Sequence, residues 1–161
     1  MLLFESGSGS SVNKAKLVKN DIGVYHSSET ETTSPQATIN SNEFLENRYE
    51  SVVLDQGYAL VNKNTITGPG NVGIQLIQYD NPAAEEVQAF GPKGKGTEDT
   101  ITKMSGYAVE GHSDNEPGDQ FGSFTITNSA ISGNPPGASV SESVFSNNPS
   151  KLKIITTSTD H

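Results

Sequence analysis

The sequence predicts an all-β protein: an antiparallel β-sandwich or jelly-roll-like domain with long loops, an extended N-terminal arm and at most one short helix. Two observations support this fold class. Ser, Thr, Asn and Gly make up 64 of the 161 residues, a composition that favours turns and extended segments over helices. Apolar and polar residues also alternate in short runs bounded by Gly, Pro and Asn, which is the pattern of half-buried strands.

The centre of the predicted sheet lies within residues 48–79. Segments 48–54 and 58–62 are rich in strand-forming residues, and the three-residue connection 55–57 ends in Gly, so we predict a β-hairpin with a bulge. After a break at Gly68-Pro69-Gly70-Asn71, apolar and polar residues alternate over 72–79. This last run predicts a strand with one apolar face.

Further strands are expected on both sides of this centre. A short helix is predicted over 82–90, because Asn81 suits the cap and Pro82 the first helical position, although 86–90 also fits a strand. The polar stretch 27–42 is expected to run extended, and 41–47 to form a loop or a single turn. The remaining predicted strands are 22–25, 100–104, 106–110, 121–127, 139–145 and 151–157.

The predicted domain organisation is an extended arm over 1–20 followed by a single β-sandwich domain over 21–161. The arm begins with the apolar tip Met1, Leu2, Leu3 and Phe4 and continues through a Ser/Gly-rich link, a composition typical of a flexible linker. The tip is either a frayed terminus or an anchor that inserts into another subunit. The anchor hypothesis gives an interface formed by Met1, Leu2, Leu3, Phe4, Lys14, Lys16, Leu17 and Val18.

Charge and composition exclude several classes of function. The formal net charge is −9, with +2 in residues 1–20 and −11 in the remainder, which disfavours binding to nucleic acid. No apolar run reaches the roughly 20 residues of a membrane span, and Glu5 interrupts the start of a would-be signal peptide. We therefore expect neither a membrane protein nor one exported by a signal peptide. The absence of Cys excludes disulfides and thiolate metal sites.

Catalytic motifs are absent as contiguous patterns. The loop 91–97 has the glycine spacing of a phosphate-binding loop but has Thr97 where the lysine should be. His112, Ser113 and Asp114 are sequence neighbours, which does not place a base between a nucleophile and an orienting acid. These observations predict that the chain is not an enzyme and needs no cofactor.

The acidic loop 112–120 is the best candidate for a cation site. Calcium prefers several carboxylate and carbonyl oxygens, although the spacing does not match an EF-hand loop, and a solvated turn is the alternative. The candidate ligands are Asp114, Asn115, Glu116 and Asp119.

A small acidic β-domain with an apolar-tipped arm and no catalytic motif resembles the capsid decoration, or cement, proteins of tailed bacteriophages. The resemblance lies in layout and composition, and it carries no site residue over to this chain. It implies a structural protein on the capsid surface of a virion, made in the host cytoplasm. Such a protein clamps major capsid protein or other virion subunits through the arm, as a homo-oligomer. Many weak contacts would then add up to stable attachment.

Two other functions stay open at this stage. One is a tail, fibre or head-fibre component of a virion. The other is a carbohydrate-binding β-sandwich module assisted by calcium at the acidic loop 112–120.

Overall fold

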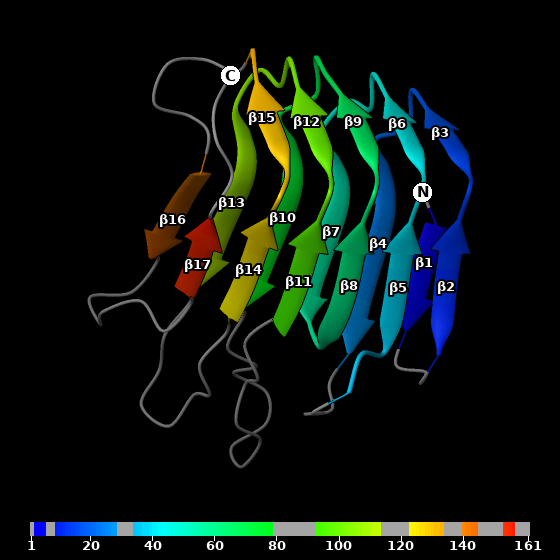
Figure 1. Cartoon of the computed structure of the whole chain (residues 1–161), viewed down its shortest axis with the longest axis vertical. Coiled ribbons are helices and arrows are strands. Elements are labelled where there is room, and N and C mark those ends of the chain that lie inside the picture. Colours follow the sequence, from blue (N-terminus) through cyan, green and yellow to red (C-terminus); the bar gives the residue numbers. More distant parts are fainter. Residues whose placement is uncertain are drawn as a thin grey trace.

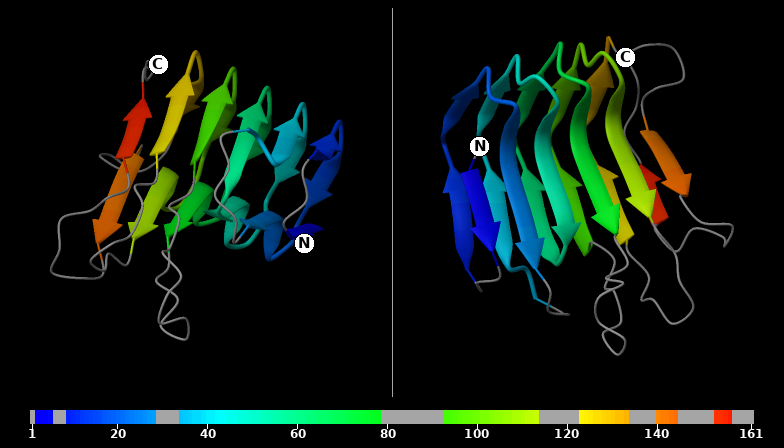
Figure 2. Two further views of the ribbon diagram at one scale, coloured as in Figure 1. Left: turned by 90° about the horizontal axis from the view of Figure 1, so that it is seen from below. Right: turned by 180° about the vertical axis from the view of Figure 1, so that it is seen from behind.

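The computed structural model describes residues 2–5, 9–28, 34–78, 93–113, 123–133, 140–144 and 153–156. These residues form a right-handed parallel β-helix, in which the chain winds as a tube with three sheets for walls (Figure 1). Each circuit, here called a coil, runs from sheet A to sheet B to sheet C. Sheets B and C face the viewer in Figure 1, and sheet A does so in the right panel of Figure 2.

Successive coils place one strand in each sheet. Sheet A contains β1 (Leu2–Glu5), β4 (Ile22–Ser28), β7 (Glu50–Gln56), β10 (Val72–Gln78), β13 (Tyr107–Ser113) and β16 (Val140–Val144). Sheet B contains β2 (Ser10–Asn13), β5 (Ala37–Asn40), β8 (Tyr58–Asn62), β11 (Lys93–Thr97), β14 (Ser123–Thr127) and β17 (Lys153–Thr156). Sheet C contains β3 (Lys16–Val18), β6 (Glu43–Leu45), β9 (Thr65–Thr67), β12 (Thr100–Thr102) and β15 (Ala130–Ser132).

The predicted antiparallel sandwich is wrong, because every strand pairing in the described part of the chain is parallel. The predicted hairpin shows the reason. Gln56 and Gly57 both have positive φ, at 57° and 68°, and they turn the chain from sheet A into sheet B. The strand that leaves this corner therefore pairs with the coils before and after it, and not with the strand that entered.

Residues 1–20, predicted as an arm, supply the first coil within the described range. Strand β1 pairs with β4, β2 with β5 and β3 with β6. Segment 41–47, predicted as a loop, contains β6. The helix predicted over 82–90 lies outside the described residues. No helix in the described ranges is long and apolar enough to cross a membrane.

The core is a column of aliphatic and aromatic side chains inside the tube. Each coil adds residues from all three walls, so apolar side chains of one coil stack on those of the next. The largest fully buried side chains are Phe44, Phe124, Ile39, Leu54, Ile66, Ile74, Leu76, Ile101, Ile126, Ile131 and His26. An alternating strand therefore has one face in this column and the other on the outside of the tube.

Sheet A bends inward near the start of its strands. A Cβ atom on Gly23 would lie 2.8 Å from a ring carbon of the core residue Phe44 and 2.4 Å from the carbonyl oxygen of Ser51. The same bend brings both Ala108 and Val109 into the core, although they are consecutive in β13. Beyond the bend the strands of sheet A alternate regularly, and this regular part carries the outer rows described below.

A ladder of side chains holds the corner between sheets B and C. The first residue of each corner has positive φ, as at Lys63 and Glu98, and the second points inward. Asn42 donates from its backbone nitrogen and its Nδ2 to Asn64 Oδ1, both at 3.0 Å. Asn64 donates in the same way to Asp99 Oδ1, at 2.8 and 2.9 Å. Each rung therefore satisfies polar groups of the neighbouring coil inside a buried corner.

Asp99 is the odd member of this ladder. Asn42 and Asn64 also use Nδ2 to donate to the backbone carbonyls of Val12 and Ile39, at 2.9 and 3.0 Å. Asp99 has the oxygen Oδ2 instead of an amide, this atom has no hydrogen-bond partner, and the residue is 1% exposed. Burial raises the pKa of Asp99 to about 7, against the opposing effect of hydrogen bonds from Asn64 and Thr97. The carboxyl group therefore favours its neutral form in the folded protein.

We predict that Asp99→Asn stabilises the protein above pH 7. The pKa of Asp99 is about 7 in the folded state against an ordinary value of 3.8, so the folded protein binds more protons between these values. The stability of the unmodified protein therefore falls as pH rises through this interval, by up to about 1.4 kcal/mol per pH unit. An asparagine does not ionise and escapes this loss.

Urea unfolding of both proteins between pH 4 and pH 8 measures the effect. The difference in unfolding free energy is expected to grow with pH and to level off above pH 7. The exposed neighbour Glu98, changed to Gln, is the control and should show no such growth. A difference between Asp99→Asn and the unmodified protein that does not depend on pH would contradict a buried, neutral Asp99.

Candidate functional site

The site residues predicted from sequence lie partly outside the described residues and partly in the first coil. Asp114, Asn115, Glu116 and Asp119, the candidate calcium ligands, lie outside the described residues, as does Met1 of the predicted interface. Of the other interface residues, Leu2, Leu3 and Phe4 lie in β1, Lys14 lies at the B–C corner of the first coil, and Lys16, Leu17 and Val18 lie in β3. Among the described side chains, no group of three or more His, Asp or Glu could hold a metal ion.

The structure brings other polar residues together on the outer face of sheet A. Val24, Val52, Ile74 and Val109 point into the core, so the next residue of each strand points outward. The parallel register aligns these outward residues in one row across four strands. The row, here called the central row, is Tyr25, Val53, Gln75 and Glu110.

A second outward row lies two residues further along the same strands. Its described side chains are Ser27, Asp55 and Ile77. The outer face is partly sheltered from solvent, because the outward-facing Val53 and Ile77 are only 1% and 8% exposed. A polar group between these rows is therefore half desolvated.

Tyr25 and Asp55 connect the two rows. Tyr25 of β4 is in register with Val53 of β7, and Asp55 lies two residues after Val53 in β7. A long aromatic side chain can reach across this diagonal between neighbouring strands. The Tyr25 hydroxyl donates a hydrogen bond to Asp55 Oδ2. Both residues are half-buried on the outer face of sheet A. This contact joins a phenol and a carboxyl group at a position that still reaches solvent.

The environment of Asp55 favours its protonated form. Burial raises the pKa of the Asp55 carboxyl, and the hydrogen bond from Tyr25 acts in the opposite direction without cancelling the rise. An acid with a raised pKa can both accept and release a proton closer to neutral pH than an ordinary aspartate can. The pair is therefore suited to acid–base chemistry.

Glu110 adds a second carboxyl group to the central row. It lies three strands from Tyr25, and strands are about 4.8 Å apart, so the row extends over about 14 Å. Glu110 is 8% exposed, and Gln75 lies between the two residues in the row. The row thus offers a phenol, an amide and a carboxyl group in a line along the tube.

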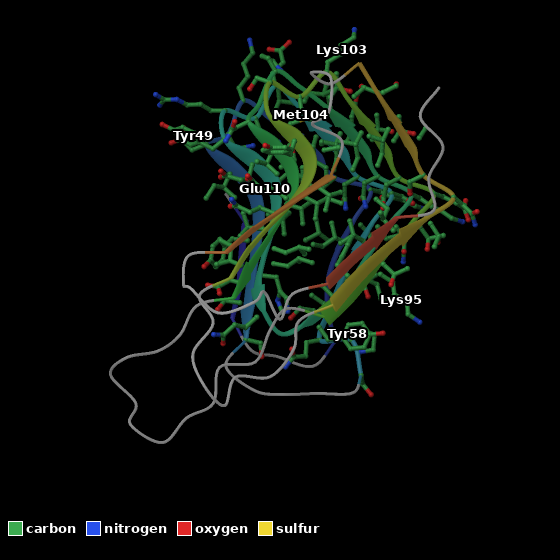
Figure 3. All side chains as sticks on the ribbon, turned by 90° about the vertical axis from the view of Figure 1, so that its left-hand side faces the viewer. Tyr49, Tyr58, Lys95, Lys103, Met104 and Glu110 are labelled. Carbon is green, nitrogen blue, oxygen red and sulfur yellow. The ribbon has the colours of Figure 1, made fainter. Side chains whose placement is uncertain are left out.

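An exposed aromatic side chain borders this face. Tyr49 precedes β7 and is 44% exposed. The Arg48 guanidinium lies 4.8 Å from the centre of its ring, and Arg48 also pairs with Asp21 at 3.7 Å. In Figure 3, which looks along the tube, Tyr49 projects on the side away from Lys95 of sheet B. Aromatic rings that border a polar surface are common at binding sites.

Sequence reasoning missed this site because its members are far apart in the chain. Tyr25, Asp55 and Glu110 belong to three different coils, and they have no spacing that a local motif would show. His26, next to Tyr25, is 1% exposed and faces the core, where burial lowers its pKa. These residues can be recognised as one candidate site only when β4, β7 and β13 are known to lie in the same parallel sheet.

Comparison with known proteins identifies the fold. No protein-family model matches this chain, and no curated protein matches it significantly by sequence. Among solved structures, the chain is similar to the periplasmic alginate epimerase AlgG, with a TM-score of 0.65 and 16% sequence identity. The match covers 98% of this chain and 36% of AlgG, so the chain spans about a third of that protein. The similarity shows that both share a parallel β-helix.

This similarity corrects the prediction that the chain is not an enzyme. That prediction excluded catalysis because no catalytic motif is contiguous in the sequence. The fold is one on which an epimerase is built, and in a β-helix each coil brings residues from distant parts of the chain onto the same face. The absence of a contiguous motif therefore does not argue against an enzyme.

Proposed function

We propose that this chain binds a polysaccharide along the outer face of sheet A and acts on it by acid–base chemistry. The observation that carries the proposal is the hydrogen bond between Tyr25 and Asp55 on that face. The pair is half-buried on the outside of the tube, and its Tyr25 is aligned in register with Gln75 and Glu110.

The central row suits a linear ligand with many hydroxyl groups. A saccharide chain is recognised through hydrogen-bond donors and acceptors placed at fixed positions, together with apolar and aromatic surface. The row supplies the Tyr25 hydroxyl, the Gln75 amide and the Glu110 carboxyl group over about 14 Å. The strands hold these groups rigidly, which limits the entropy lost on binding.

The Tyr25–Asp55 pair is the proposed reaction centre. General acid–base catalysis needs a group whose pKa lies close to the working pH, and burial shifts the pKa of Asp55 upward. Tyr25 keeps the carboxyl group oriented by donating to one oxygen, so the other oxygen can exchange a proton with a bound sugar. A proton transfer on a sugar also agrees with the name of the similar structure, an alginate epimerase.

The test uses two substitutions in the pair and one matched control. Binding and turnover of a panel of polysaccharides are measured by calorimetry, release of reducing ends and incorporation of solvent deuterium into the sugar. Asp55→Asn is expected to lower turnover by about 10²- to 10⁴-fold while binding persists. Tyr25→Phe removes the hydrogen bond that lowers the pKa of Asp55, so the limb of the pH–rate profile that Asp55 controls should move to higher pH.

Tyr107→Phe is the control, because Tyr107 lies in the same sheet but starts β13, away from Asp55. It should leave the pH–rate profile in place. Turnover by Asp55→Asn equal to that of the unmodified protein would reject Asp55 as the reacting group. A folded protein that binds no member of the panel would reject the proposed function itself.

A second proposal is that the chain attaches to a virion, on the capsid surface or as a tail or fibre component. The supporting observation is the edge formed by the first coil. In the described residues, β1, β2 and β3 each stand at the end of their sheet, with their outer edges not paired to another strand. An unpaired edge can accept a strand of another protein, such as a capsid subunit, and Val18 beside it is 42% exposed.

Co-sedimentation of the Val18→Glu variant with virions tests whether this edge is the contact. Weaker attachment than that of the unmodified protein is expected, and equal attachment would reject the edge as the contact.

A further inference from the structure

His26 is a buried histidine whose two ring nitrogens have no hydrogen-bond partner. It points into the core from β4 and is 1% exposed, and neither Nδ1 nor Nε2 meets a donor or acceptor within the described part of the chain. A neutral imidazole has one N–H donor and one acceptor nitrogen. Burying both unpaired costs stability, and such groups are rare in folded proteins. Packing alone therefore does not explain a histidine at this position.

The His26 ring lies against the corner between sheets A and B, here called the A–B corner. This corner is built around Gly57, which has a positive φ of 68°. A Cβ atom on Gly57 would lie 3.0 Å from His26 Nε2, 2.7 Å from Ser28 Cβ and 2.8 Å from Gln36 Oε1. The imidazole therefore packs tightly against the residues that form the corner.

Gln36 connects the two coils that meet at the A–B corner. Its Nε2 donates to Ser28 Oγ at 2.7 Å, and its Oε1 accepts from the backbone nitrogen of Tyr58 at 3.1 Å. Its backbone nitrogen also donates to the carbonyl oxygen of Tyr58 at 2.7 Å. Gln36 thus joins the end of β4 to the start of β8 in the next coil. Asp55 lies only two residues before Gly57, so the same corner holds the strand end that carries the proposed reaction centre.

No described charged side chain faces the His26 ring. Its register partner in β7 is the buried Leu54, and Glu5 of β1 is in register with Ser27 and not with His26. The corner residues Ser28, Gln36 and Gly57 are uncharged. Of the other titratable residues on the surrounding strands, Tyr25 and Asp55 lie on the outer face of sheet A, Glu50 begins β7, and Tyr58 precedes the inward Ala59. A proton on the ring would therefore meet no described carboxylate.

We propose that His26 is an acid-sensitive switch: the neutral ring keeps the A–B corner closed, and a proton on the ring opens this corner, which positions Asp55. This inference rests on the proposed function, because it names how the same site is regulated. An imidazolium has two N–H donors and a charge, which are costly to bury unpaired. Gln36 Oε1 is an acceptor at this corner, and an imidazolium that takes it breaks the hydrogen bond from Tyr58.

Proton binding sets the direction of the switch. Burial lowers the pKa of His26 below its ordinary value of 6.5, so the open corner, where the ring reaches solvent, binds a proton more readily than the closed one. The closed corner is therefore fully favoured above pH 6.5 and is lost as pH falls from 6.5 through the lowered pKa. Across this interval the equilibrium between open and closed corners changes by up to about tenfold per pH unit.

Hydrogen exchange of single backbone amides tests the opening between pH 7 and pH 4. Protection is expressed relative to the intrinsic exchange rate at each pH. We expect the protection of the Gln36 and Tyr58 amides to fall as the pH is lowered, by up to about tenfold per unit below pH 6.5. The Asn42 amide, which donates to Asn64 Oδ1 at the B–C corner, is the internal control and should keep its protection.

Two kinds of variant assign the effect to His26. His26→Leu removes the titrating ring and keeps apolar bulk, and His26→Gln serves if the leucine variant does not fold. In either variant the protection of Gln36 and Tyr58 should no longer depend on pH. Asp55→Asn removes the other titratable group near the corner and should keep the fall in protection. A fall that persists in the His26 variants, or that disappears in Asp55→Asn, would overturn the proposal.

The outcomes separate this inference from the proposed function. If the switch regulates the site, turnover of a polysaccharide from the panel should persist to lower pH in His26→Leu than in the unmodified protein. Equal acid limbs in the two pH–rate profiles overturn the regulation and leave saccharide turnover in place. Failure of the whole panel to bind at pH 7, where the corner is closed, rejects the proposed function, whether or not the two amides lose protection in acid.

Discussion

The asparagine ladder at the B–C corner is the interaction on which the rest of the structure depends. Asn42, Asn64 and Asp99 each accept hydrogen bonds from the coil before, and they are buried where no solvent could replace those bonds. The ladder fixes how far each coil is rotated relative to the next. Once that register is fixed, every outward row is fixed as well, including the central row of sheet A. Loss of one rung would leave buried polar groups unpaired and disturb the rows on both sides.

The alignment of the proposed binding face depends on an uneven distribution of chain length around each coil. From the start of the sheet-B strand to the start of the next sheet-A strand, the path takes 12, 13, 14 and 14 residues in the first four coils. Between sheets A and B, the connection varies from the single residue Gly57 to the whole of 79–92. This nearly uniform path aligns Tyr25, Gln75 and Glu110 in one row. The variable connections all leave from one end of sheet A, so they can change without disturbing that alignment.

The sequence could predict the strands but not how they pair. Alternation over 58–62 and 72–78 marks strands correctly, since an inward and an outward face are required in a sandwich and in a β-helix alike. Alternation of apolar and polar residues does not say whether neighbouring strands pair in a parallel or an antiparallel direction. The repeat is also hidden, because the sheet-A strands that begin at 22, 50, 72 and 107 are 28, 22 and 35 residues apart. A usable signal was present: Asn64-Thr65-Ile66-Thr67 and Asp99-Thr100-Ile101-Thr102 occupy the same corner of successive coils. The site could not be predicted without this pairing, because each coil contributes only one or two of its residues.

Mapping saccharide binding onto the three sheets tests the proposed site most directly. Titration of the isotope-labelled protein with the member of the polysaccharide panel that binds most tightly, followed by backbone amide chemical shifts, reports which outer face contacts the ligand. We predict that amides around Tyr25, Asp55, Gln75 and Glu110 shift together and saturate with one dissociation constant, while those of sheets B and C stay in place. Shifts confined to sheet B or sheet C would contradict the assignment of the site to sheet A.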